Sequence, residues 1–275
     1  MTTIIYSVLI LSAIGAVCAV ILVLASKYMN VPVDEKFTDI RECLPGANCG
    51  ACGFAGCDGY AQALTDGGES RTNLCVPGAD SVSRKLSDIL GTEFEDVVEQ
   101  VAFVQCMGDC SAAKQKYEYN GISTCHAANM LYNGKWDCTC GCLGYGDCAA
   151  VCPNDAIKLV NGIAKVITSR CAGCGLCAKQ CPNHLIKLFP DVGRAVVTCS
   201  NTDRGAVAKA KCENACIACK KCERNCPSDA VHVINNLAVI DYDKCTNCQL
   251  CAKNCPVGCI KISDFSGIHR DIIAG

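Results

Sequence analysis

The residues best suited to chemistry in this chain are its cysteines, which number 29 among 275 residues. Three runs share the spacing Cys-x2-Cys-x2-Cys-x3-Cys-Pro, and they begin at Cys171, Cys216 and Cys245. In such a run three closely spaced thiolates wrap one face of a small metal–sulfide cube, and the cysteine before the proline reaches a neighbouring cube. The spacing therefore predicts [4Fe–4S] iron–sulfur clusters.

A fourth run is a wider variant that extends from Cys138 to Cys152. Tyr145 stands where the run from Cys216 has Cys219, and we expect Cys138 to replace that ligand from upstream. Because the fourth cysteine of each run crosses to the neighbouring cluster, the four runs predict four sites. The expected ligand sets are Cys138, Cys142, Cys148 and Cys181; Cys152, Cys171, Cys174 and Cys177; Cys216, Cys219, Cys222 and Cys255; and Cys226, Cys245, Cys248 and Cys251.

A separate cysteine block begins at Leu44 and reads Leu-Pro-Gly-Ala-Asn-Cys-Gly-Ala-Cys-Gly-Phe-Ala-Gly-Cys. Its glycines let the backbone turn sharply around a bulky inorganic group. Four cysteines here predict a fifth [4Fe–4S] site. We expect Cys43 to be a structural thiol; the alternative is that it substitutes for one of the four ligands. The expected ligands are Cys49, Cys52, Cys57 and Cys75.

Several cysteines remain outside these five sites. Cys259 aligns with Leu185 of the other repeat, which predicts a packing role. Five others include enough thiols for a sixth cluster. Its ligands would be Cys106, Cys110 and Cys125 with either Cys199 or Cys212; alternatively, Cys199 and Cys212 are remnants of a duplication.

The second half of the chain is an internal repeat. The run from Cys171 recurs 74 residues later at Cys245, and the same offset relates further cysteine pairs. These pairs are Cys125 and Cys199, Cys138 and Cys212, Cys142 and Cys216, and Cys148 and Cys222. In each unit two short β-branched runs flank a turn, Asn161-Gly162 or Asn235-Asn236, and predict a β-hairpin. Each hairpin brings the cysteine run before it beside the cysteine run after it.

Two other uses of cysteine fit less well. Tetrahedral zinc also uses paired Cys-x2-Cys, but zinc sites rarely carry a third and fourth cysteine at this spacing before a proline, and no histidine accompanies the runs. Disulfides need an oxidising compartment. The compartment of the cysteines can be inferred from the N-terminal segment of the chain.

Residues between Ile4 and Ala25 carry no charge and no proline. A helix of this length measures roughly 33 Å, enough to cross the hydrocarbon core of a bilayer. No basic residue precedes it and no Ala-x-Ala site follows it, which argues against a signal peptide. Lys27 follows the helix, so the positive-inside rule predicts a single-pass protein of the cell membrane with the bulk of the chain in the cytoplasm. We expect Cys18 to be an apolar residue of this helix.

These features predict an α+β chain in successive parts. The parts are a transmembrane anchor (1–28), a linker (29–42), a small Cys-rich [4Fe–4S] domain (43–80), a connector with a short helix and a strand (81–135), two tandem bacterial-ferredoxin-like 2[4Fe–4S] modules (136–192 and 193–268), and a tail (269–275). Within the connector we expect a helix from Ser81 to Leu90 and a strand from Val101 to Gln105. Because aromatic residues make up only 5% of the chain, clusters rather than a large apolar core should hold the fold together.

Composition and missing motifs exclude several functions. The net charge of −2 excludes a strongly basic nucleic-acid binder. No Gly-x-Gly-x-x-Gly opens a helix after a strand, so no nicotinamide site is predicted, and no self-contained catalytic constellation stands out. One positive group near the third run is a candidate docking surface for an acidic electron donor; the alternative is a solvated face that offsets the charge of the clusters. The group comprises Lys209, Lys211, Lys220, Lys221 and Arg224.

Taken together, the membrane helix, the cysteine block from Leu44 and the tandem modules resemble the B subunit of the Rnf complex over nearly the whole chain. The segment from Gly141 to Cys148 is similar to the long form with two double-cluster units. The resemblance implies a translocase subunit: a membrane-anchored electron carrier that accepts electrons from soluble reduced ferredoxin and relays them to other subunits, which reduce NAD⁺ and transport Na⁺ or H⁺. The alternative is an electron-feeding iron–sulfur subunit of another membrane or soluble reductase.

Overall fold

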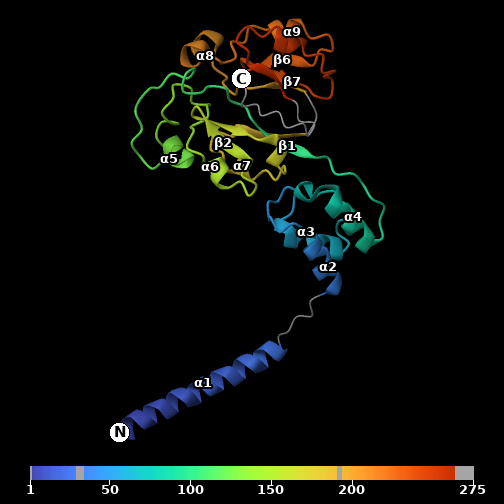
Figure 1. The fold of residues 1–275 in the computed structure, drawn as a ribbon, viewed down its shortest axis with the longest axis vertical. Coiled ribbons are helices and arrows are strands. Elements are labelled where there is room, and N and C mark those ends of the chain that lie inside the picture. The colour runs from blue at the N-terminus through green and yellow to red at the C-terminus, as the bar shows by residue number, and fades with distance from the viewer. Residues whose placement is uncertain (1, 29–33, 191–193, 264–275) are drawn as a thin grey trace.

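The chain forms a long N-terminal helix, a small helical domain and a larger body of short strands and helices (Figure 1). The computed structural model describes residues 2–28, 34–190 and 194–263. The predicted tail, residues 269–275, and part of the predicted linker lie outside the described residues.

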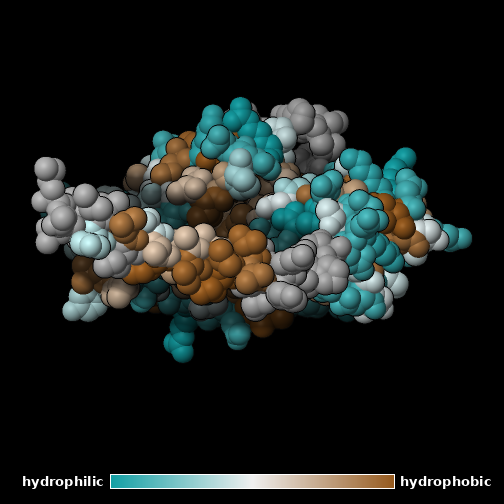
Figure 2. Space-filling view, turned by 90° about the horizontal axis from the view of Figure 1, so that it is seen from below, coloured by the Kyte–Doolittle hydropathy of each residue, from teal (hydrophilic) through white to brown (hydrophobic). Residues whose placement is uncertain are grey.

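Helix α1 spans Thr2–Tyr28. Large apolar side chains along it are exposed, including Tyr6, Leu9 and Leu22. Figure 2 views the molecule from the side on which α1 lies in Figure 1, and apolar side chains gather on that face. Within the part of the chain that the structure describes, no helix is found that is both long enough and apolar enough to cross a membrane. The predicted transmembrane span stays a prediction.

The small helical domain packs helices around one apolar core. Its elements are α2 (Glu35–Cys43), α3 (Gly56–Thr65), η1 (Val76–Gly78) and α4 (Ala79–Leu90). Ile40, Tyr60, Leu64 and Leu86 are almost fully buried in this core. The helix predicted from Ser81 to Leu90 is confirmed as α4, which ends where Gly91 adopts the left-handed conformation.

Both predicted hairpins are confirmed. β2 (Ile157–Val160) pairs with β3 (Ile163–Val166), and β6 (Val231–Ile234) pairs with β7 (Leu237–Ile240), each pair antiparallel. Asn161 and Gly162 have φ of 48° and 78°, and Asn235 and Asn236 have φ of 49° and 62°. Positive φ at both central residues is what a type I′ turn requires, and its twist matches that of the strands.

Two further strand pairs join residues far apart in the sequence. β1 (Gln100–Val104) pairs with β4 (Ile186–Pro190), and β5 (Arg194–Val197) pairs with β8 (Ile260–Ser263). β1 confirms the strand expected from Val101 to Gln105, but it lies in the sheet of the first module rather than in a separate connector. The first module therefore begins structurally near residue 100, and the segment between β1 and the first cysteine run is an insertion within it.

The two modules pack against each other through these outer strands. Val101 and Phe103 of β1 share a buried apolar cluster with Val196 of β5, and the rings of Phe189 and Tyr242 lie 5.6 Å apart edge to face. Short helices support the cysteine loops. They are α5 (Cys125–Met130), α6 (Asp147–Ala150), η2 (Thr168–Arg170), α7 (Leu176–Gln180), α8 (Gly205–Lys211), α9 (Lys221–Arg224) and α10 (Leu250–Lys253).

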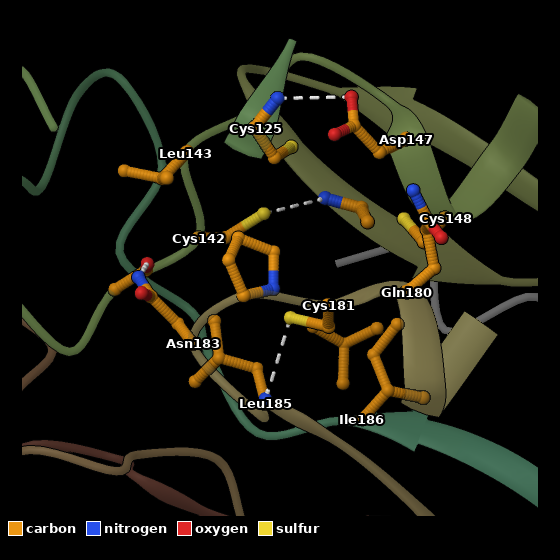
Figure 3. A pocket seen from close by; sticks show the side chains of 14 residues that line it. Cys125, Cys142, Leu143, Asp147, Cys148, Gln180, Cys181, Asn183, Leu185 and Ile186 are labelled. Carbon is orange, nitrogen blue, oxygen red and sulfur yellow. Dashed lines mark hydrogen bonds between the residues drawn. The ribbon is translucent and has the colours of Figure 1, made fainter. Parts of the chain in front are cut away.

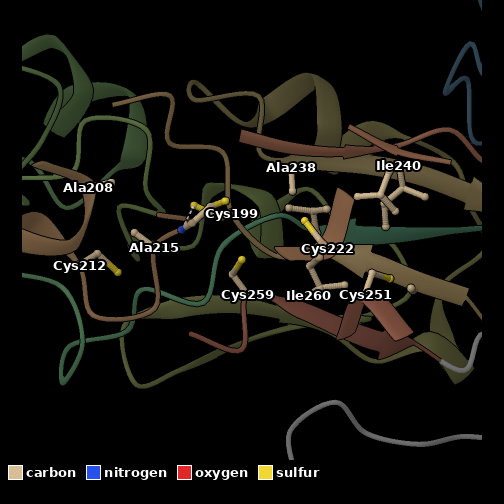
Figure 4. Packing of buried hydrophobic residues seen from close by; sticks show 14 residues of the cluster. Cys199, Ala208, Cys212, Ala215, Cys222, Ala238, Ile240, Cys251, Cys259 and Ile260 are labelled. Atoms are coloured by element: carbon tan, nitrogen blue, oxygen red, sulfur yellow. Dashed lines mark hydrogen bonds between the residues drawn. The ribbon is translucent and has the colours of Figure 1, made fainter. Parts of the chain in front are cut away.

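Thiol groups form much of the buried interior of both modules. In the second module, cysteines alternate with small aliphatic residues such as Ala208, Ala215 and Ala238 (Figure 4). Such an interior offers little apolar area for burial. We expect it to depend on whatever the thiols bind.

Candidate iron–sulfur sites

The N-terminal cysteine block forms one group, which we call site N: Cys49, Cys52, Cys57 and Cys75. Three of these thiols are buried and Cys52 is half-buried. Burial raises the pKa of Cys75 to about 11, and the three other thiols of the group lie near enough to raise it further. Asn48 accepts a hydrogen bond from the backbone N–H of Cys57 at 2.8 Å, which fixes the loop between the first ligands.

Site B comprises Cys152, Cys171, Cys174 and Cys177, as the crossing rule predicts. All four line one cavity of about 330 Å³. The backbone N–H of Ala102 in β1 points at the Cys171 sulfur, 3.4 Å away. Burial raises the pKa of Cys177 to about 12, with the other three thiols of the site adding to the shift.

Site C comprises Cys216, Cys219, Cys222 and Cys255, and these four line a cavity of about 310 Å³. Cys259 lines the same cavity, and its sulfur lies 3.6 Å from that of Cys255. The hydrogen bond with Cys259 lowers the pKa of Cys255 to about 5. Sequence reasoning gave Cys259 a packing role, whereas the structure places its thiol among ligand candidates.

The crossing rule predicts site D from Cys226, Cys245, Cys248 and Cys251. Cys245 and Cys248 lie near Cys251, where their charges reinforce the effect of burial, which raises the pKa of its thiol. Cys226 accepts a hydrogen bond from the backbone N–H of Ala230 at 3.3 Å.

Site A differs from the expected set. Cys142, Cys148 and Cys181 line a cavity of about 360 Å³, and the fourth thiol there is Cys125 rather than Cys138. Figure 3 shows the four side chains converging on this space. Cys138 lines a different cavity. Sequence reasoning had grouped Cys125 with a sixth cluster instead.

Local hydrogen bonds explain why Cys125 reaches site A. Thr124 caps α5, accepting from the backbone N–H of Ala127. Asp147 of α6 accepts hydrogen bonds from the backbone N–H groups of Cys125 at 2.9 Å and His126 at 3.1 Å. These hydrogen bonds hold the end of the insertion against α6. They place the Cys125 thiol in site A, where Tyr145 supplies no sulfur ligand.

Three of the four cysteines that precede a proline in the runs share one geometry. The sulfurs of Cys152, Cys181 and Cys226 each accept a hydrogen bond from the backbone N–H four residues later, over 3.3 to 3.5 Å. Hydrogen bonds to the sulfurs are one of the means by which proteins set iron–sulfur potentials. Four thiols around a cavity, with backbone N–H groups aimed at the sulfurs, are the donor set that a [4Fe–4S] cluster takes. The residues present fit this group.

A single metal ion fits less well. Within the described residues, no group of three or more His, Cys, Asp or Glu side chains is close enough to hold one ion. Around zinc the four sulfurs would lie roughly 3.8 Å apart. The ligands of a cube bind at its separate corners and need not converge on one ion.

The five positive residues of the candidate docking surface divide into two kinds. Lys211 and Lys220 form ion pairs with Asp203 at 2.7 Å and Glu223 at 3.6 Å. Lys209, Lys221 and Arg224 are exposed, and no ion pair joins them to another side chain within the described residues.

Three protein families match parts of the chain. An Fe-S cluster family matches residues 44–77, the LdpA Fe-S cluster-binding domain matches residues 136–191, and the 4Fe-4S binding domain matches residues 238–261. These segments hold most of the cysteines of sites N, A, B and D. The chain therefore contains iron–sulfur domains.

Full-length relatives decide the family. The B subunit of the Na(+)-translocating ferredoxin:NAD(+) oxidoreductase complex of Acetobacterium woodii is 40% identical over 91% of this chain and 75% of its own length. The proton-translocating counterpart of Clostridium ljungdahlii is 38% identical over 89% of this chain and 87% of its own. The B subunit of the ion-translocating oxidoreductase complex of Methanosarcina acetivorans is 37% identical over 89% of this chain and 92% of its own. The chain belongs to the Rnf B-subunit family.

This membership confirms the resemblance read from the cysteine runs. Members of the Rnf B-subunit family are parts of an oxidoreductase complex, so the thiol sites are those of one subunit among several. The iron–sulfur domains suit an electron-transfer role.

Proposed function

We propose that this chain is the electron-entry subunit of a membrane-associated ion-translocating ferredoxin:NAD⁺ oxidoreductase. It would accept electrons from reduced ferredoxin and pass them to partner subunits. When bound, each [4Fe–4S] cluster supplies one-electron carriage at a potential within about −700 to +450 mV. The chain's own residues would hold the clusters and donate hydrogen bonds to their sulfur ligands.

The observation that carries this proposal is the contiguity of the thiol sites. Lys179, beside site B, donates a hydrogen bond to the backbone carbonyl of Cys49 in site N at 2.6 Å. Within the first module, the Cys177 thiol of site B lies near Cys148 of site A and adds to the rise of its pKa to about 12. Sites N, B and A therefore form an unbroken series from the helical domain into the first module.

The uncharged run from Ile4 to Ala25, within α1, supports a role as membrane anchor. On this proposal the anchor holds site N near the membrane while the two modules extend toward soluble ferredoxin. The family supports association with other subunits. The alternative, an iron–sulfur subunit of another reductase, shares the clusters but not these partners.

Co-purification separates the two functions. The full-length chain, affinity-tagged and extracted from membranes under anaerobic conditions, should bring down partner subunits and contain at least about 20 iron atoms, four for each of the five sites. The isolated complex should oxidise reduced ferredoxin. A chain that stayed in the soluble fraction without such partners would favour the alternative, and stoichiometric zinc in place of iron would overturn both.

The candidate docking surface can be tested at its exposed positive residues that form no ion pair within the described part of the chain. Lys221→Glu with Arg224→Glu reverses two exposed charges beside site C and should slow ferredoxin oxidation by the complex about tenfold or more at low salt. The matched control is Lys36→Glu with Lys85→Glu, the same charge change on two exposed residues of the helical domain. If both pairs of substitutions gave equal rates and equal salt dependence, the docking assignment would be dropped.

A further inference from the structure

Five thiols line a second large cavity, which lies between the two modules and belongs to none of sites N, A, B, C or D. The cavity measures about 410 Å³, compared with about 360 Å³ at site A and 310 Å³ at site C. Its thiols come from separate segments: one follows β1, two lie in the loop before α6, one follows β5 and one ends α8. They are Cys106, Cys138, Cys140, Cys199 and Cys212.

The sulfurs of this cavity receive hydrogen bonds as the ligand sulfurs elsewhere do. Cys106 accepts from the backbone N–H of Cys142 at 3.4 Å. Cys199 accepts from the backbone N–H groups of Asn201 at 3.5 Å and Cys216 at 3.4 Å. The side-chain amide of Asn201 lies 3.6 Å from the Cys138 sulfur. Backbone and amide dipoles thus converge on three of the five sulfurs.

The walls of the cavity are tightly built. The backbone N–H of Lys114 donates to the carbonyl of Lys211, and that of Glu213 donates to the carbonyl of Ala112, each at 2.9 Å. A Cβ on Gly108 would lie only 3.0 Å from the Cys212 sulfur and 3.8 Å from the Cys106 sulfur. The backbone therefore approaches the thiols closely, as glycine permits around a bulky inorganic group.

The repeat selects among the five thiols. Cys138 and Cys212 stand 74 residues apart, at equivalent positions of the two units, so each unit contributes one of them to this cavity. Cys199 is the equivalent of Cys125, which site A uses, whereas site C has Cys219 and leaves Cys199 available. The hydrogen bond from Asn201 favours Cys138 over Cys140 as the ligand.

We propose that Cys106, Cys138, Cys199 and Cys212 hold a sixth [4Fe–4S] cluster, which joins the two modules. We call this set the bridge site, and Cys140 is its spare thiol. The composition differs from the sixth set considered from sequence, because Cys125 belongs to site A and Cys110 is exposed near Gly162.

The position of the bridge site gives it a role in the proposed electron relay, and in that respect the inference rests on the proposed function. A single hydrogen bond joins Cys106 to the backbone of Cys142 in site A, and another joins Cys199 to the backbone of Cys216 in site C. The bridge site is therefore next to a ligand segment of each module. The series N, B, A, bridge, C and D then runs through the whole cysteine-rich part of the chain.

The test counts iron and acid-labile sulfide in the full-length chain, purified anaerobically within its complex and corrected for the other subunits. The wild type should contain about 24 iron atoms per chain. Cys106→Ser with Cys212→Ser should contain about 20, with a matching loss of visible absorbance, whereas Cys110→Ser and Cys140→Ser should match the wild type.

Each outcome decides the proposal. A wild-type count of about 20, or an unchanged count in the double variant, would overturn the bridge site while leaving the proposed function intact. If the double variant failed to fold, the wild-type count would decide alone, together with integration of the electron-spin signals of the fully reduced protein. A count near zero with bound zinc would instead remove the proposed function itself.

Discussion

The two modules carry related sequences but complete their first sites differently. In the second module site C takes four thiols from its own runs, and a fifth thiol, Cys259, lines the same cavity. In the first module Tyr145 replaces one thiol, and Cys125 from the insertion completes site A. The comparison teaches that each cavity keeps at least four thiols while their origin in the chain changes.

The difference also frees a residue. Because site C does not need Cys199, the residue equivalent to Cys125 is available for the bridge site. The presence of Tyr145 at the position equivalent to Cys219 thus agrees with the use of Cys125 at site A. It also agrees with the different use of Cys199, the counterpart of Cys125.

The largest expected effect comes from removing iron from both modules. Anaerobic chelation should abolish cooperative unfolding of residues 100–263, because thiols and small side chains fill these interiors. The helical domain, with Tyr60 and Leu86 in an apolar core, should keep more hydrogen-exchange protection. A chelated chain whose modules still melted cooperatively, followed by differential scanning calorimetry, would contradict this dependence on metal.

The second-largest effect is expected from removing the fourth thiol of site A, Cys125. Cys125→Ser should remove about four iron atoms, since among the described residues only three other thiols line that cavity. Cys125→Ser with Tyr145→Cys should restore them by giving the first module the pattern of the second. Iron and sulfide analysis measures both, with Cys110→Ser as control. If Cys125→Ser kept the iron content of the wild type, Cys125 would not be the fourth ligand of site A, and the proposed difference between the modules would be wrong.

A smaller effect is expected in the second module. Cys219→Ser should lose less iron than Cys125→Ser, because the Cys259 sulfur already lies beside that of Cys255 and can take the vacant corner. Cys219→Ser with Cys259→Ser should lose about four iron atoms. Equal losses in the single and double variants would show that Cys259 has a packing role only.

The smallest effects concern the two hairpin turns. A Cβ on Gly162 would overlap the Cys110 sulfur, so Gly162→Asn should lower the apparent thermal midpoint of the iron-loaded protein. The reverse exchange, Asn236→Gly, removes one exposed hydrogen bond to Thr202 and should change stability by less than about 1 kcal/mol. Thermal scans monitored by visible absorbance measure both; a larger shift for Asn236→Gly would reverse the expected asymmetry.

Local patterns in the sequence predicted the parts that depend on neighbouring residues. The hairpins follow from their turn residues, α4 follows from its glycine stop, and the grouping of thiols around the cavities of sites B and C follows from fixed spacing. The ligand sets themselves stay predictions that the iron counts will test.

Non-local features were not predicted. The pairing of β1 with β4 depends on tertiary packing across the insertion, and the sequence of neither strand indicates which strand it pairs with. The choice of Cys125 over Cys138 depends on the hydrogen bonds of Asp147, which spacing does not reveal. One signal was available in the sequence. The offset of 74 residues makes Cys125 equivalent to Cys199 and Cys138 equivalent to Cys212, so Cys125 and Cys138 occupy different positions of the repeat unit.

The pairing of β1 with β4 also sets an order for assembly during synthesis. Site N is complete once Cys75 has been made, but the first module cannot close until β4, which ends at Pro190, can pair with β1. The bridge site must then wait for Cys212, site D for Cys251 and site C for Cys255. Iron–sulfur loading should therefore proceed from the N-terminal end, and a ribosome stalled before residue 186 would present the thiols of sites A and B without the strand that covers them.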